Sequence, residues 1–343
     1  MEIGIIGLAQ SGKSTLFEIM TGIQSRNVFG EPSVRGIAKV PDGRFEKLAS
    51  IFKPEKVSPA TIPFLDVNVA GEKQWESMRK LLSSADGFVH IVDGFTTSTV
   101  TEVTSRYKKL ADELVFSDLM MVENKLERLA KIPQASLKGE ELIQSNILPR
   151  IKDTLEKGIP IRRLEFSANE IKALRGFAFW TLRPELVVLN MHENNPSLVG
   201  AFEKESGISA PVIGINCQME AEIAQLDAHE RHEFLHSIGA KEPAFELIIK
   251  TAFSLLDRIC YFTVGEDEVK AWVIPAGSTA PRAATAIHKD FERGFIKAEV
   301  VSYDEFISCG ESLESAKSAG KLRLEGKEYI VQDGDIISFR FNI

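Results

Sequence analysis

The chain has 343 residues, enough for two or three domains with a sizeable core. Its hydrophobic fraction of 44% and charged fraction of 26% are typical of globular proteins. The formal net charge of −8 excludes a global basic field for nucleic acid, so we expect no DNA partner, and any contact with RNA needs a local basic patch.

The cysteines and the apolar runs indicate the compartment. Cys217, Cys260 and Cys309 lie far apart and match no metal or redox spacing, which is typical of a reducing environment. No apolar run approaches the ~20 residues of a membrane span, and a predicted strand that begins at Met1 leaves no room for a signal peptide. We therefore expect a cytoplasmic protein without membrane contact.

The first element in chain order is a short apolar strand, MEIGII, followed by the loop GLAQSGKST at 7–15 and a helix that opens with TLFEIM. Gly7, Gly12, Lys13 and Ser14 fit the P-loop pattern GxxxxGK[ST], and strand–loop–helix is the setting that this motif requires. The loop amides and the helix N-terminus would surround phosphate, Lys13 would reach the β- and γ-phosphates as the candidate catalytic residue, and the Ser14 hydroxyl would hold Mg²⁺. The predicted phosphate-binding residues are Ala9, Gln10, Ser11, Gly12, Lys13, Ser14 and Thr15.

Four further apolar runs predict strands: IPFLDV, GFVHIVDGF, LVVLN and PVIGIN. Short buried strands separated by helices imply a mostly parallel sheet covered on both faces, which binds ligands at the carboxyl ends of its strands. Asp66, near the end of the second strand, is placed to hold Mg²⁺ through water. This pattern predicts an α/β P-loop NTPase.

Residues 101–182 differ from the segments around them. Two long helical patterns, the second interrupted by Pro149, are joined by PQASLKG. An ordinary pair of crossover helices is one interpretation, but the insertion is larger than the usual connection, which favours a protruding helical arm. Its lysines and arginines, mixed with acids, fit either contacts with RNA phosphates or a solvated helix face.

The character of the chain changes again near Tyr261, where short β-rich runs surround one helix. This pattern predicts a small α+β domain with a mixed sheet. The predicted domains are a P-loop domain at 1–100 and 183–258, an inserted helical arm at 101–182, and a terminal domain at 259–343.

The base-reading end of the site is predicted to follow the strand LVVLN. P-loop GTPases carry [NT]KxD there, and its carboxylate accepts two hydrogen bonds from guanine. This chain has NMHE, and a longer carboxylate on a repositioned loop need not accept both guanine donors. A second base loop follows PVIGIN. The predicted base-binding residues are Asn190, Met191, Glu193, Asn216, Cys217 and Gln218.

Together these segments resemble the YchF/Obg-like ATPase family of P-loop proteins. The resemblance covers nearly the whole chain and is densest over the last ~130 residues. The segments that carry it include GLAQSGKSTLF, VPDGRFEKLASIFKPEK, NMHENNP, MEAEIAQLDAHERHEFLHSIG, YFTVGEDEVKAWVIPAGSTAPRAATAIHKDFERGFIKAEVVSYDEFI and EGKEYIVQDGDIISFRFNI. The resemblance implies a G domain with an inserted helical coiled-coil arm, a terminal TGS domain of β-grasp type, a preference for ATP over GTP, and association with ribosomes.

Both switch segments depart from that family. The threonine of switch I is absent from VFGEPSVRG, where Ser33 is the nearest hydroxyl. The segment after Asp66 is shortened, so that the γ-phosphate-sensing glycine is absent or shifted to Gly71.

We therefore expect a switch that binds Mg²⁺ with ATP, or with GTP, and hydrolyses the nucleotide slowly. We expect it to act near the ribosome and to contact ribosome or RNA through its arm and its terminal domain. The alternative is a nucleotide-dependent binding module without hydrolysis.

Overall fold

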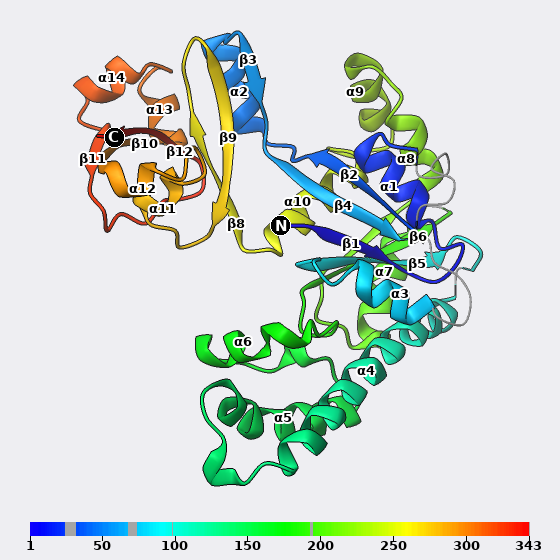
Figure 1. The fold of residues 1–343 in the computed structure, drawn as a ribbon. Coiled ribbons are helices and arrows are strands. Elements are labelled where there is room, and N and C mark those ends of the chain that lie inside the picture. Colours follow the sequence, from blue (N-terminus) through cyan, green and yellow to red (C-terminus); the bar gives the residue numbers. More distant parts are fainter. Residues whose placement is uncertain (25–31, 68–73, 98, 193–194, 343) are drawn as a thin grey trace. The chain divides into compact units, whose positions relative to one another are not determined.

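The computed structural model describes residues 1–24, 32–67, 74–97, 99–192 and 195–342 (Figure 1). Two compact units make up the chain. The first contains Met1–Gly36 and Phe64–Ile248, and the second contains Ile37–Pro63 and Ile249–Ile343. Among the described residues, no helix combines the length and the apolar character needed to cross a membrane.

The first unit is built around a six-stranded sheet with the order β2-β4-β1-β5-β6-β7. Its strands are β1 (Ile3–Ile6), β2 (Ser33–Lys39), β4 (Thr61–Val67), β5 (Gly87–Gly94), β6 (Glu185–Met191) and β7 (Val212–Ile215). The pairs β1–β4, β1–β5, β5–β6 and β6–β7 are parallel. Every residue of β6, which lies between β5 and β7, is buried, as expected for a largely apolar run in a sheet covered on both faces.

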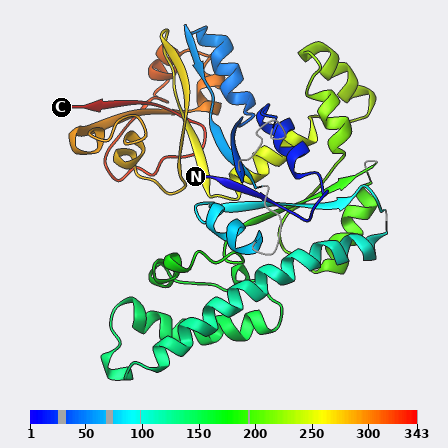
Figure 2. The same cartoon turned by 45° about the vertical axis from the view of Figure 1, so that its right-hand side comes forward.

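Helices cover both faces of this sheet (Figures 1 and 2). The helices of this unit are α1 (Lys13–Thr21), α3 (Gln74–Leu81), α4 (Val100–Ala130), α7 (Pro196–Ser206), α8 (Cys217–Ile223) and α9 (Ala228–Ser237), of which α9 stands away from the sheet, and α10 (Ala244–Ser254) runs from this unit into the second. On one face, α4 and α7 pack against the central strands through a cluster that includes Tyr107, Phe202 and Leu189. On the other face, α1 contacts α8, with Leu16 and Phe17 fully buried.

The inserted segment forms a helical hairpin, in which α4 is followed by α5 (Glu140–Glu156). A third helix, α6 (Ala168–Leu174), packs against α5, and an apolar cluster that includes Val122 and Leu148 fills the interior. Pro149 lies inside α5 without interrupting it, contrary to the expected break. The residue is exposed, so water can satisfy the carbonyl oxygen that would otherwise accept its missing N–H. Short 3₁₀ turns lie at Gln134–Ser136, Ile161–Arg163 and Arg175–Phe177.

The second unit contains a mixed six-stranded sheet with the order β11-β10-β12-β8-β9-β3. Its strands are β3 (Lys56–Ser58), β8 (Arg258–Thr263), β9 (Glu268–Pro275), β10 (Phe295–Ser302), β11 (Arg323–Glu325) and β12 (Asp335–Phe341). The pairs β8–β12 and β3–β9 are parallel, whereas the other pairs with a described register are antiparallel. Its helices are α2 (Gly43–Phe52), α11 (Ala280–Ala284), α12 (Phe291–Gly294), α13 (Tyr303–Ser308) and α14 (Leu313–Ser318).

The two units differ from the expected domain bounds. The arm at 101–182 lies within the first unit, and residues 249–258, expected in the P-loop domain, lie in the second. Residues 37–63 were expected in the P-loop domain, but they belong to the second unit. The reason is that β3 extends the second sheet beside β9, while Phe45 and Phe52 of α2 contact Phe262 and Phe306, with ring centroids 6.1 and 5.7 Å apart. Sequence order alone could not indicate this pairing, because β3 and β9 lie far apart in the chain.

Candidate nucleotide site

The loop between β1 and α1 has the geometry of an anion cradle. Gly12 is the N-cap of α1 and has φ +104°, a left-handed conformation that favours glycine. A Cβ at Gly7 would lie 2.4 Å from the carbonyl oxygen of Ile91, so only glycine fits there. No side chain among the described residues caps α1, so the N–H groups of its first turn remain available to an anion.

Lys13 and Ser14 begin α1 and lie at the mouth of this loop. The Lys13 ammonium donates hydrogen bonds to the carbonyl oxygens of Gly7, at 3.1 Å, and Leu8, at 2.8 Å. Burial lowers the pKa of Lys13 below its usual value of 10.5, and the negative charge of Asp66 offsets part of this shift. The amine therefore folds back over the loop, and a bound phosphate would supply a stronger partner.

Ser14 lies in the first turn of α1, which follows β1, and Asp66 lies near the end of β4, the parallel neighbour of β1. Ser14 Oγ donates to Asp66 Oδ2 at 2.9 Å, and Asp66 is completely buried at the end of β4. A hydroxyl and a carboxylate are hard oxygen ligands of the kind that Mg²⁺ takes together with phosphate oxygens. The two residues therefore fit a magnesium ion bound beside the phosphates.

Asn190, predicted as a base-binding residue, is a buried brace between three loops. Its Nδ2 donates to the carbonyl oxygen of Ser11 at 3.1 Å, and its Oδ1 accepts from the backbone N–H of Cys217 at 3.2 Å. Asn190, at the end of β6, thereby fixes the P-loop relative to the start of α8.

The other predicted base-binding residues have different environments. Asn216 caps α8 by accepting from the Met219 N–H and donates to the carbonyl oxygen of His192. The thiol of Cys217 is buried, which raises its pKa to about 12, and Gln218 is exposed in the first turn of α8. The Met191 side chain packs in the core, so it cannot face a base in this structure.

Three predicted features lie wholly or partly outside the described residues. The first is Glu193. The second is the segment after Asp66, of which residues 68–73, including Gly71, are not described. Of VFGEPSVRG, residues 28–31 also lie outside them, whereas Ser33 begins β2.

The segment after β5 was not predicted as part of the site. Phe95 lies there with its ring centroid 4.9 Å from that of His192, which follows β6. Both residues line a cavity of about 330 Å³ with Thr96, Thr97 and Asn195. The signal that could have found Phe95 is its place directly after a buried parallel strand, at the same edge as the P-loop.

The chain is similar to known proteins along essentially its whole length. The family model YchF-GTPase_C, described as "Protein of unknown function (DUF933)", matches residues 258–342. A protein of Pasteurella multocida named ribosome-binding ATPase YchF is 40% identical over 362 residues, covering 99% of each chain. A Bacillus subtilis protein of the same name is 37% identical over 364 residues, again covering 99% of each.

A solved structure gives the same result for the fold. The YchF GTPase of Schizosaccharomyces pombe superposes with a TM-score of 0.86 at 24% identity, covering 99% of this chain and 97% of the other. This likeness confirms the predicted α/β fold class. The identity and coverage of the bacterial relatives show that the chain belongs to the YchF family.

Proposed function

We propose that this protein binds a purine nucleoside triphosphate with Mg²⁺ and hydrolyses it slowly. The observation that carries the proposal is the hydrogen bond of 2.9 Å between Ser14 and Asp66, beside a P-loop in which a Cβ at Gly7 or Gly12 would clash with the surrounding protein. A metal ion in this position would be held by the Ser14 hydroxyl, with Asp66 acting through water. It would supply positive charge to the β- and γ-phosphates.

Each residue of the cradle then has a role in binding. The amides of Ala9–Thr15 surround the phosphates, and Lys13 exchanges its two carbonyl partners for phosphate oxygens. Asn190 holds the loop against α8. The exposed residues Gln218, in the first turn of α8, and His192, after β6, form the base end. Phosphoryl transfer depends mainly on positioning and charge stabilisation, so a rigid cradle can bind well while chemistry stays slow.

ATP is the proposed preferred nucleotide. Relatives that are 32–40% identical over essentially the whole chain carry the name ribosome-binding ATPase. The NMHE segment lacks the lysine and the aspartate of the guanine-reading motif. Titration of ATP and GTP against the protein, each with Mg²⁺, tests this choice, and tighter binding of GTP would contradict it.

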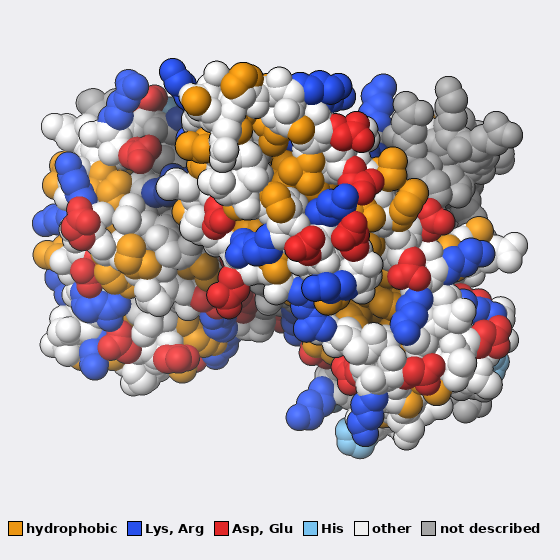
Figure 3. Space-filling view, turned by 90° about the horizontal axis from the view of Figure 1, so that it is seen from below, with side chains coloured by type: hydrophobic (Ala, Val, Ile, Leu, Met, Phe, Trp, Pro, Cys, Tyr) orange, Lys and Arg blue, Asp and Glu red, His pale blue; other side chains and the backbone are white. Residues whose placement is uncertain are grey.

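The ribosome is the proposed macromolecular partner, because the relatives are named for binding it. On the face that Figure 3 shows, lysine and arginine side chains are scattered among acidic ones. With a net charge of −8, contacts with RNA would be local. Exposed cations that could make them lie on the arm and in the second unit: Lys108, Lys109, Arg128, Lys131, Lys138, Lys289, Arg293, Lys297, Lys317 and Lys327.

Release of γ-phosphate, measured with and without ribosomes, tests hydrolysis. The matched blank is Lys13→Ala, which removes the cation that folds over the loop. Release above the blank supports the ATPase. Release equal to the blank, with nucleotide still bound, would replace the ATPase by a nucleotide-dependent binding module.

A further inference from the structure

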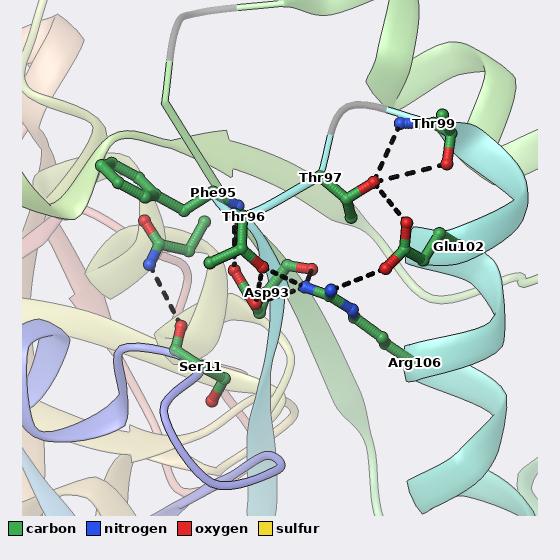
Figure 4. Close-up of polar contacts among 9 residues, drawn as sticks. Ser11, Asp93, Phe95, Thr96, Thr97, Thr99, Glu102 and Arg106 are labelled. Carbon is green, nitrogen blue, oxygen red and sulfur yellow. Dashed lines mark hydrogen bonds and ion pairs between the residues drawn. The ribbon is translucent and has the colours of Figure 1, made fainter.

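We propose that Arg106 of α4 is a positioning residue for the purine base, acting through its ion pair with Asp93, which lies near the end of β5 just before the turn that carries Phe95. This inference rests on the proposed nucleotide site and names a residue that neither the P-loop nor the base motif contains. Figure 4 shows the contacts from which it is built.

The Asp93 carboxylate organises the turn after β5. Its Oδ1 accepts from the backbone N–H groups of Phe95, at 2.9 Å, and Thr96, at 3.2 Å, while its Oδ2 accepts from Thr96 Oγ1 at 2.7 Å. Such an Asx turn fixes the backbone at Phe95 and hence the direction in which the ring leaves the strand.

Arg106 attaches this turn to the helical arm. One terminal nitrogen of the guanidinium, Nη1, pairs with Asp93 Oδ2. The same nitrogen donates to Thr96 Oγ1 at 2.7 Å and to the Asp93 carbonyl oxygen at 3.2 Å. Its other terminal nitrogen donates to Glu102 Oε1 at 2.8 Å, and Glu102 Oε2 accepts from Thr97 Oγ1 at 2.7 Å. One planar guanidinium therefore holds both ends of the Asp93–Thr97 turn.

The location of the turn connects it to the nucleotide. Asp93 pairs with Asn190 in the register of β5 and β6, and Asn190 binds the P-loop carbonyl of Ser11. Arg106 and Asp93 also line a cavity of about 260 Å³ together with Leu8 and Ala9 of the P-loop. A purine attached to phosphates in the P-loop would extend toward the ends of β5 and β6, where Phe95 offers an aromatic face for stacking.

The fold of α4 does not depend on Arg106. Val103 and Tyr107 anchor the same helical turns in the core, whereas the Arg106 side chain is 26% exposed. Loss of the ion pair should therefore loosen the Phe95 turn and leave the sheet and the arm in place. The expected effect is weaker base recognition with unchanged phosphate binding.

The test uses the full chain and two ligands, Mg·ATP and Mg·tripolyphosphate, which has phosphates but no base. The double variant Asp93→Asn with Arg106→Ala removes the ion pair without changing net charge, and the asparagine keeps an oxygen for the turn. We expect the Kd for ATP to rise about tenfold, the order of one lost stacking contact. The Kd for tripolyphosphate should stay within about twofold, a change that corresponds to a small free-energy difference.

The matched control is Glu170→Gln with Arg150→Ala. It removes another ion pair, 3.8 Å long and within the arm, and likewise leaves the net charge unchanged. It should change neither affinity. Arg106→Lys, which keeps the charge but not the fork, should give an intermediate Kd for ATP.

Unchanged ATP affinity in the double variant would overturn the positioning role, and so would an equal loss for both ligands, which indicates general damage to the site. Wild-type protein that binds tripolyphosphate but not ATP would refute the purine pocket and this inference with it. Wild-type protein that binds neither ligand would refute the proposed function itself.

Discussion

Asn190 Nδ2 donates to the carbonyl oxygen of Ser11 at 3.1 Å across 179 positions of sequence, and this bond joins the last turn of the P-loop to the end of β6. The other end of the same amide accepts from the Cys217 N–H. Asn190 is 8% exposed, so water cannot readily replace either contact. The nucleotide cradle is therefore held by a side chain from a strand that the phosphates themselves would not touch.

Asn190→Ala should weaken both folding and nucleotide binding. The substitution leaves the Ser11 carbonyl and the Cys217 N–H without their partner, which costs about 1–3 kcal/mol in unfolding free energy. The control is Asn124→Ala, which removes an exposed bond to the Met120 carbonyl and should cost little. Denaturant unfolding and ATP titration measure the two effects. A stability equal to wild type would show that the brace contributes nothing.

Gly12→Ala should abolish nucleotide binding while the chain stays folded. Gly12 has φ +104°, and a Cβ there would lie 2.7 Å from Asn190 Nδ2, so alanine must distort the loop and the brace together. The backbone strain costs about 1–3 kcal/mol. Gly200→Ala in α7, where a Cβ meets nothing within 4 Å, is the matched control and should bind ATP normally. Normal binding by the Gly12 variant would contradict the predicted cradle.

Much of this architecture follows from local sequence. The apolar strands, the P-loop and the two long arm helices could be predicted because hydrophobic periodicity and glycine spacing are local signals. The fully buried β6 is the clearest case, since its continuous apolar run has no other stable environment. The carboxyl-edge rule then places Ser14 beside Asp66.

Other features depend on pairings that no local signal encodes. The assignment of 37–63 to the second unit follows from β3 joining β9, and the role of Asn190 as a brace follows from the parallel register of β6 and β7. The pair of Asp93 and Arg106 was likewise missed, because an aspartate after a strand and an arginine in a helix each have many ordinary explanations. Only their proximity distinguishes them.

The affinity for Mg·ATP should depend on pH through Lys13. Burial lowers the pKa of this lysine below 10.5, and only the ammonium form donates to phosphate with a full positive charge. Affinity is therefore retained at neutral pH and lost as the pH rises through the lowered pKa, before an ordinary lysine would titrate. Titrations of ATP at a series of pH values measure this loss. A Lys13→Arg variant that binds ATP should keep a flat profile over the same range, because its guanidinium stays protonated.

Glu185 should be a major contributor to the stability of the first unit. Its buried carboxylate contacts His90 Nδ1 at 2.8 Å, accepts from the Tyr107 hydroxyl at 3.4 Å, and pairs with Arg162. Burial alone would raise its pKa, but the hydrogen bond with His90 and the charge of Arg162 outweigh burial and lower the pKa below 4.5. A lowered folded-state pKa means that this stabilisation is present above the unfolded value near 4.5 and is lost as the pH falls through the folded value.

Glu185→Gln should therefore destabilise the protein at neutral pH by about 3 kcal/mol, the low end for breaking a buried pair, because Arg162 is partly exposed. The variant should also lose less stability than wild type when the pH is lowered, since the titrating group is gone. Glu156→Gln, which removes an exposed partner of Lys152, is the matched control and should change the unfolding free energy by less than about 0.5 kcal/mol. Denaturant unfolding at neutral and acidic pH separates the two variants. Equal acid sensitivity of wild type and Glu185→Gln would assign the loss of stability to other carboxylates.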